Sequence, residues 1–199
     1  IRFEDGRAEY RNRFIKTTGL LAEIEAGAAL WAGILEPVEA SVREGCGART
    51  RMKDASSTDI IVHRGEALTT FYQCGDVYRL DPRTLETLNL DHRAKAPGDI
   101  ATAHAHIDPD SGGMLNYALK IGPKSSYRFY TVGATGGATV VARAPAKPPR
   151  YVHSFGVTDN HIVLLAGPLA LNMGKLIGSS LAKRSFLECF EWKPELGTE

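Results

Sequence analysis

Short β-rich runs, joined in pairs by turn-forming residues, recur through the middle and the end of the chain, and they limit its fold more than any other feature. Apolar and polar side chains alternate within each run, and Gly, Asp, Asn or Pro at each join supplies the backbone angles of a hairpin. The four pairs, with expected turns at Asp81–Pro82, Asp108–Gly113, Ala134–Gly137 and Thr158–Asn160, cover residues 76–89, 104–119, 126–144 and 152–167. No strong helix pattern separates them, so the sequence predicts an all-β protein: a propeller, a barrel or a sandwich.

The spacing of the hairpins favours the propeller among these three architectures. Two hairpins make one four-stranded blade of about 40–45 residues. The 199 residues of the chain then supply at most about four or five blades. Residues 20–35 reduce that number, because their apolar character predicts a short buried helix. We therefore expect residues 1–199 to form a single incomplete propeller domain with no separate second domain.

The charge balance and the cysteines exclude several classes of protein. Lys and Arg number 24 against 23 Asp and Glu, and this net charge of +1 is too small for a strongly basic nucleic-acid binder. Cys46, Cys74 and Cys189 lack the spacing of a zinc site or a disulfide framework, which favours a reducing, cytoplasmic location. No apolar run approaches the roughly 20 residues of a membrane helix. The chain opens at Ile1 rather than at Met, so the lack of a targeting segment carries little weight.

Histidines are the residues with the clearest potential for chemistry. His104 and His106 are two apart, which would place both imidazoles on one face of a strand, and His153 is expected to begin another strand about two blades' worth of hairpins later. Neutral imidazoles suit Fe, Zn, Cu or Ni, and the second ring nitrogen of each needs a hydrogen-bond acceptor. Spacing alone favours the alternative of ordinary polar residues. The remaining histidines are expected at the surface: His63, His92 and His161.

Several segments of the chain resemble successive motifs of the carotenoid cleavage oxygenase family. The early segment RAEYRNRF is similar to the YxxRF region of that family, and RYVHSFGVTDNHIVLLAGPL is the most specific match. The matching segments keep the family's order and cover residues 7–27, 75–88, 101–112, 150–169 and 186–198. The 150–169 segment is most similar to the branch that holds the animal retinal-forming oxygenases and the retinoid isomerase.

The resemblance implies a seven-bladed β-propeller with a non-haem Fe(II) ion, Fe(2+), on its axis, held by four histidines. By motif, the first ligand is His104, the leading His of AHxH, and the second is His153 of HSFGVT. The other two ligands belong to later blades and have no counterpart here, so the chain is expected to be about the first half of such an enzyme.

Three positions near these motifs need separate treatment. Ala105 stands where the family usually has Pro, and this difference leaves the predicted ligands unchanged. Gln73 occupies a position where several members have a Glu that orients an iron-bound imidazole; its carbonyl can still accept that N–H, without contributing charge. We interpret His106 as a non-ligand despite its spacing.

The activity implied by the resemblance is a dioxygenase that uses O2 to split a conjugated C=C bond of a carotenoid, apocarotenoid or stilbene-like substrate into two carbonyl products. Tyr151 and Phe155 flank His153 and are the candidates to line the tunnel for an apolar polyene. Residues 169–183 mix apolar side chains with lysines, which fits either peripheral membrane contact or packing on a neighbouring blade. The resemblance to family members that take up substrate at membrane surfaces favours the membrane contact. Two alternatives stay open: an inactive propeller fragment that serves only in interaction, and a retinoid-type isomerohydrolase with the same iron.

Overall fold

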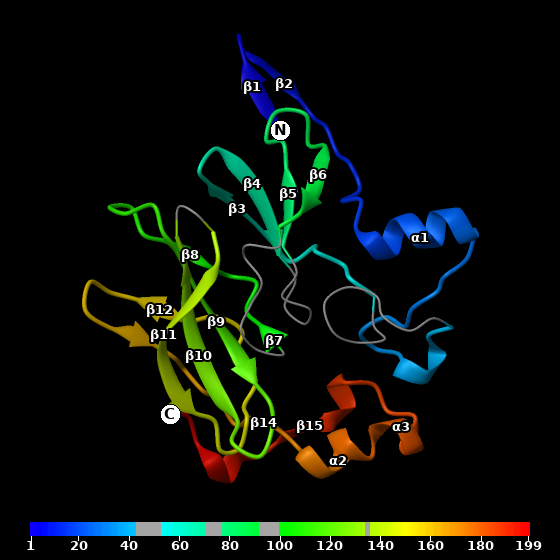
Figure 1. Cartoon of the computed structure of the whole chain (residues 1–199), viewed down its shortest axis with the longest axis vertical. Coiled ribbons are helices and arrows are strands. Elements are labelled where there is room, and N and C mark those ends of the chain that lie inside the picture. The colour runs from blue at the N-terminus through cyan, green and yellow to red at the C-terminus, as the bar shows by residue number, and fades with distance from the viewer. Residues whose placement is uncertain (43–52, 71–76, 92–99, 134–135) are drawn as a thin grey trace.

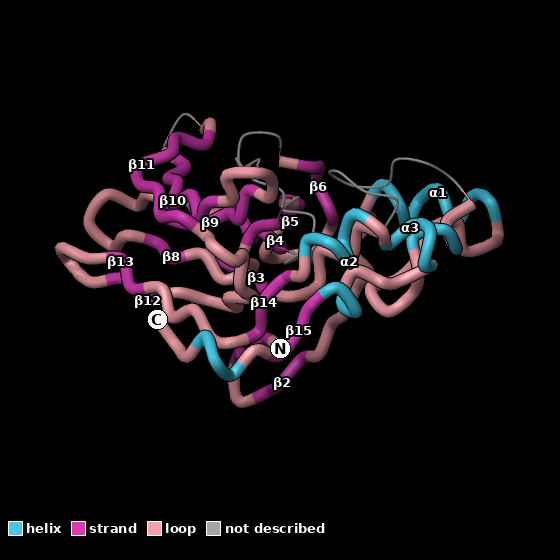
Figure 2. Tube along the Cα trace, turned by 90° about the horizontal axis from the view of Figure 1, so that it is seen from below, coloured by secondary structure: helices cyan, strands magenta, loops and turns pink. Residues whose placement is uncertain are grey.

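A computed structural model describes residues 1–42, 53–70, 77–91, 100–133 and 136–199 of the chain. Within these residues most regular structure is antiparallel sheet, as the hairpin pattern predicts (Figure 1). The short helices lie to one side of the sheets (Figure 2). Gln73, His92, Cys46 and Cys74 fall outside the described residues.

The first sheet of the described chain has four strands in the order β3-β4-β5-β6. Its strands are β3 Asp59–His63, β4 Glu66–Thr70, β5 Tyr78–Leu80 and β6 Thr87–Leu90. Arg64 and Gly65 join β3 to β4, and both have a positive φ (56° and 78°), as a tight two-residue hairpin requires. The hairpin predicted around Asp81–Pro82 is confirmed by the pairing of β5 with β6.

The second sheet contains five strands in the described residues, and β9 and β10 form its centre. Its strands are β7 Ile100–Ala101, β8 His106–Ile107, β9 Met114–Lys120, β10 Ser126–Val132 and β11 Ala138–Pro145. The hairpins predicted for residues 104–119 and 126–144 are confirmed by the β8–β9 and β10–β11 pairings.

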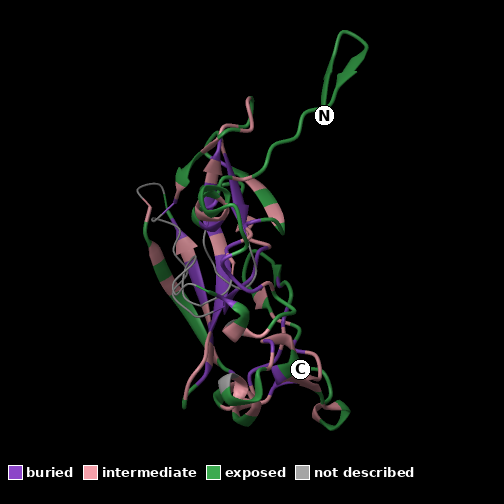
Figure 3. Ribbon diagram, turned by 90° about the vertical axis from the view of Figure 1, so that its right-hand side faces the viewer, coloured by how far each residue is buried: buried purple, intermediate pink, exposed green. Residues whose placement is uncertain are grey.

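Three two-stranded antiparallel sheets complete the strands of the described chain. They are β1 Arg2–Glu4 with β2 Arg7–Glu9, β12 Gly156–Val157 with β13 Ile162–Val163, and β14 Leu169–Leu171 with β15 Phe190–Trp192. The β1–β2 hairpin is exposed along its whole length and projects from the rest of the chain (Figure 3). The pairing of β12 with β13 confirms the turn predicted at Thr158–Asn160.

Helical segments are short and lie outside the sheets. They are α1 Thr18–Ala26, α2 Met173–Ile177 and α3 Ser179–Ala182, with 3-10 turns η1 Val38–Ala40, η3 Leu187–Cys189 and η4 Pro194–Leu196. Thr17 caps α1 by accepting the Leu20 N–H, and Gly27 ends it in the left-handed conformation. The prediction of a buried helix over residues 20–35 is wrong, because α1 stops at Ala26 and leaves Leu21 and Ile24 exposed. Among the described residues no helix is long and apolar enough to cross a membrane.

The central strands β9 and β10 of the second sheet carry buried residues on both faces, and the alternation along them explains why. Even-numbered residues of β9 and β10, such as Met114 and Tyr130, pack with Leu68 of β4 and with Val77, which directly precedes β5. Odd-numbered residues, such as Tyr117, pack on the opposite face with the segment that carries Val152, Phe155 and Ala166. Successive side chains of a strand point to opposite faces. The sheet is therefore the middle layer of a stack, with β3–β6 on one side and residues 150–166 on the other.

A buried arginine joins the far layer of that stack to the end of the chain. The side chain of Arg150 is 5% exposed. Its guanidinium donates to the carbonyl oxygens of Ala166 (3.1 Å), Gly197 (3.0 Å) and Leu196 (3.4 Å), and it pairs with the carboxylate of Glu199 at 3.1 Å. A buried cation is stable only when its donors are satisfied. These contacts hold residues 196–199 against the start of the segment that carries His153.

Candidate metal centre

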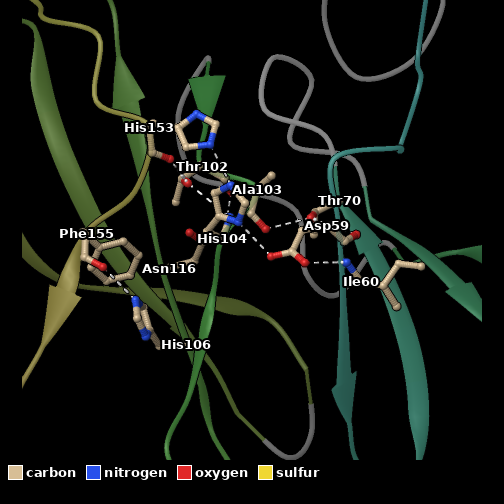
Figure 4. Close-up of polar contacts among 10 residues, drawn as sticks. All are labelled: Asp59, Ile60, Thr70, Thr102, Ala103, His104, His106, Asn116, His153 and Phe155. Carbon is tan, nitrogen blue, oxygen red and sulfur yellow. Dashed lines mark hydrogen bonds and ion pairs between the residues drawn. The ribbon is translucent and has the colours of Figure 1, made fainter.

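His104 lies on a bulge in the second sheet rather than within a strand. Ala101 pairs with Ala118 and His106 pairs with Leu115, so four residues of this segment lie opposite two residues of β9. A bulge bends the chain and changes the direction of a side chain, and such bulges are common beside active sites. The bulge turns the His104 imidazole toward the segment that carries His153 (Figure 4). The expectation that His104 and His106 share one strand face is therefore wrong.

His153 lies in an extended segment that belongs to no strand, so the prediction that it begins a strand is also wrong. Strand β12 starts three residues later, at Gly156. Side chains of the second sheet hold this segment by its carbonyl groups. Thr102 Oγ1 donates to the His153 carbonyl at 2.5 Å, and the Tyr117 hydroxyl donates to the Val152 carbonyl.

The two predicted ligands meet through their Nε2 atoms, which are 2.8 Å apart. The ring centroids are 4.7 Å apart and the ring planes are inclined by 52°. Imidazole nitrogens bind a metal such as zinc at about 2.0–2.1 Å, so two of them side by side on one ion lie about 3 Å apart. The observed pair therefore has nearly the separation of two ligands on one metal.

A carboxylate from the first sheet orients His104. Asp59, the first residue of β3, accepts a hydrogen bond at Oδ2 from His104 Nδ1 at 2.8 Å (Figure 4). A carboxylate only accepts, so Nδ1 carries the proton of a neutral His104 ring and Nε2 presents its lone pair toward His153. Carboxylate–histidine pairs of this kind fix ring orientation in metal sites. The role of Asp59 could not be predicted from the sequence, because 45 residues separate it from His104 and no motif links the two.

Tyr151 contacts the second histidine from the other side. Its hydroxyl is 2.9 Å from His153 Nδ1, and its ring packs edge-on against Phe190 with centroids 6.0 Å apart. Burial raises the pKa of the Tyr151 hydroxyl, which keeps it a neutral phenol able to donate or accept. Tyr151 therefore holds the ring of His153, a contact that its predicted role in substrate lining did not include.

Within the described residues, two of the predicted ligands can be compared with the geometry of a metal site. His104 and His153 fit such a site, because each ring directs Nε2 toward the other and has a hydrogen-bond partner on Nδ1. No group of three or more His, Cys, Asp or Glu side chains suited to a metal ion occurs in the described part of the chain. Gln73, predicted to contact an iron-bound imidazole, lies in the range 71–76 outside it.

The other predicted residues lie away from the histidine pair. Phe155 is buried among aromatic rings, with Tyr117 edge-on at 5.6 Å between centroids, so its predicted role in lining a substrate tunnel stays a prediction. His161 is exposed in the β12–β13 turn, as expected. The surface position predicted for His63 is wrong: it is 8% exposed, and its Nε2 is 2.8 Å from the carbonyl of Gly112, in the turn before β9.

Comparisons with known proteins match the chain over most of its length. The family model described as "Retinal pigment epithelial membrane protein" matches residues 1–199. Resveratrol cleavage oxygenase 1 of Aspergillus fumigatus is 27% identical over 98% of the chain and 37% of its own length. The mitochondrial carotenoid-cleaving dioxygenase of Macaca fascicularis is 29% identical over 76% of the chain and 29% of its own length. A solved structure of the Synechocystis apocarotenoid oxygenase superposes with a TM-score of 0.69 at 23% identity, covering 92% of the chain and 39% of the enzyme.

The stacked antiparallel sheets and the superposition on the apocarotenoid oxygenase place the chain in the class of β-propeller proteins that this oxygenase represents. The match over the whole chain is more specific. The chain belongs to the retinal pigment epithelial membrane protein family, the family of the carotenoid oxygenases, and it spans less than two fifths of the relatives described above.

Proposed function

We propose that the full-length protein containing this chain is a non-haem Fe(II)-dependent dioxygenase that cleaves a conjugated C=C bond of a carotenoid or apocarotenoid to carbonyl products. In this proposal the chain is one incomplete domain, the first part of a seven-bladed propeller, and it supplies two of four iron ligands. The observation that carries the proposal is the 2.8 Å approach of His104 Nε2 and His153 Nε2, at the two positions that the family motifs nominate.

The residues around the pair keep both rings ready to bind a metal. Asp59 holds the proton of His104 on Nδ1 and leaves Nε2 as an acceptor. The Tyr151 hydroxyl accepts from His153 Nδ1 when that nitrogen carries the proton, and donates to it otherwise. Bound Fe(II) supplies the redox chemistry that allows O2 to react with a conjugated double bond. Both rings therefore keep a satisfied second nitrogen with or without the metal.

The substrate class follows from the family and from the character of the chain near the histidines. Named relatives act on resveratrol and on carotenoids, which all carry conjugated double bonds. Tyr151 places an aromatic ring beside His153, and Phe190 packs edge-on against Tyr151, as an apolar substrate requires. We favour a polyene over a polar substrate for this reason.

Peripheral membrane contact and a cytoplasmic location form part of the same proposal. Ile177 and Leu181, on α2 and α3, are 80% and 96% exposed. Exposed apolar side chains beside basic ones are typical of a surface that touches lipid head groups. Lys175 forms an ion pair with Glu191 at 2.8 Å, so Lys183 is the better candidate for a head-group contact.

Product analysis on the full-length protein tests the proposed reaction. The protein is loaded with iron and incubated under isotopically labelled O2 with a panel of carotenoids, apocarotenoids, stilbenes and retinyl esters. We expect two labelled carbonyl products from a polyene, and none from a His153→Ala control. A single isomerised alcohol from a retinyl ester would instead indicate an isomerohydrolase. A protein that holds iron and forms no product would indicate a role in interaction only.

A further inference from the structure

Four main-chain carbonyls of the segment 150–155 accept hydrogen bonds from side chains of the second sheet. The donors come from three strands and the bulge. The pairs are the Tyr127 hydroxyl with Arg150 O (3.2 Å), the Tyr117 hydroxyl with Val152 O, Thr102 Oγ1 with His153 O (2.5 Å) and His106 Nε2 with Phe155 O (2.8 Å). The segment pairs with β14 at its start, where Arg150 is bridged to Ala170 and the Tyr151 N–H donates to the Leu169 carbonyl at 2.8 Å. Residues 152–155, which lie in no strand, take their position from the side-chain bonds. The register of His153 therefore depends on these side chains.

Two of the four donors belong to the same short motif as the first ligand. Thr102 and His106 lie two residues before and two residues after His104. Thr102 Oγ1 also accepts the N–H of His104 at 3.1 Å, so one hydroxyl joins the main chains of both predicted ligands. Figure 4 shows Thr102 between the two histidines, and His106 turned away from them toward Phe155.

The contact of His106 determines its protonation pattern. A carbonyl oxygen only accepts, so the hydrogen bond to Phe155 O places a proton on His106 Nε2. That nitrogen is therefore committed as a donor and does not present a lone pair to a metal. The ring also packs edge-on against Phe155, with centroids 4.7 Å apart and planes inclined by 77°.

We infer that Thr102 and His106 are positioning residues, which set the distance between His104 and His153 by holding the carbonyls of the second segment. This inference rests on the proposed metal site. A metal site tolerates ligand displacements of only about 0.5 Å. A segment released from two of its four donors would leave that range, so both side chains matter for metal affinity although neither contacts the metal.

Metal titration of the full-length protein tests the inference. Co(II) is added to the metal-free protein and followed by its visible absorption, which reports both affinity and coordination. His106→Phe keeps an aromatic ring against Phe155 and removes the donor, whereas His106→Gln restores an N–H. Thr102→Val removes the hydroxyl with little change of shape, and Thr102→Ser restores it. His161→Ala is the matched control, because that histidine is exposed in a turn.

We expect His106→Phe and Thr102→Val to weaken Co(II) binding about 10–100-fold, the usual effect of losing a group that orients a ligand. His106→Gln and Thr102→Ser should recover most of that loss, and His161→Ala should match the unmodified protein. One result would overturn the inference but not the proposed metal site. In it, His106→Phe and Thr102→Val leave the Co(II) affinity and spectrum unchanged, whereas His104→Ala loses binding. The inference would also be overturned if His106→Phe and Thr102→Val weaken Co(II) binding but His106→Gln and Thr102→Ser fail to restore it. Equal, negligible binding by the unmodified protein and His104→Ala would overturn the proposed metal site itself.

Discussion

The two predicted ligands are held by different means. His104 lies on a bulge whose flanking residues pair with β9, so the main chain of its own sheet fixes its place, and Asp59 from the first sheet fixes its ring. His153 has no strand partner, and side chains from the second sheet hold its carbonyl and those of its neighbours. Main-chain pairing tolerates substitution because every residue supplies it. A side-chain hydrogen bond is lost when its side chain is replaced, so we expect the position of His153 to be the more sensitive of the two to mutation.

Removing either imidazole gives the largest expected effect. His104→Ala and His153→Ala should each abolish turnover by the full-length protein and lower its iron content, because each leaves the site one ligand short. Iron per protein and product formation are measured for both variants. If His153→Ala retains metal and activity, the segment around His153 carries no ligand. The comparison between the two histidines as ligands would then be wrong.

Asp59 tests how the first ligand is oriented. Asp59→Ala removes the acceptor of the His104 N–H and should weaken metal binding about 10–100-fold. Asp59→Asn keeps an oxygen acceptor without the charge and should lose less. Competition with a chelator measures the affinity. Nitrogen NMR of the metal-free protein should show the proton on His104 Nδ1 in the unmodified chain; a proton on Nε2 instead would contradict the assigned orientation.

Tyr117 tests how the second segment is held. Tyr117→Phe keeps the ring in the core and leaves the Val152 carbonyl without its donor, which should cost about 1–3 kcal/mol of unfolding free energy. Urea unfolding of the full-length protein measures the change. Tyr151→Phe is the comparison variant, because its less buried hydroxyl contacts a side chain rather than a main-chain carbonyl, and it should cost less. The reverse order would show that the main-chain contact is unimportant.

Substitution of His161 should have the smallest effect on stability and metal content. It is exposed in the β12–β13 turn, and its main chain makes the turn contacts with Thr158. His161→Ala should therefore change the unfolding free energy by less than about 0.5 kcal/mol and leave metal content unchanged. A loss of metal in this variant would show that the turn histidine belongs to the site.

The hairpins could be predicted from the sequence because alternation and turn residues are local properties. The nearness of His104 and His153 could be predicted only through the family motifs, since 49 residues separate them. Asp59 could not be predicted, because its contact arises from the packing of one sheet on another. The burial of His63 was missed for the same reason: its partner is the carbonyl of Gly112, in a turn of the neighbouring sheet. The absence of a strand at residues 151–155 could not be predicted, because an extended segment has the same alternation as a strand.

Arg150 imposes an order of events on a growing chain. The bulge that carries His104 needs only residues up to the end of β9, at Lys120, so it can form early. The guanidinium of Arg150, by contrast, finds its acceptors at Ala166 and at residues 196–199. A cation in that position is unstable until those acceptors have left the ribosome. During synthesis His153 therefore reaches its final position later than His104. The pair of histidines is assembled in two stages.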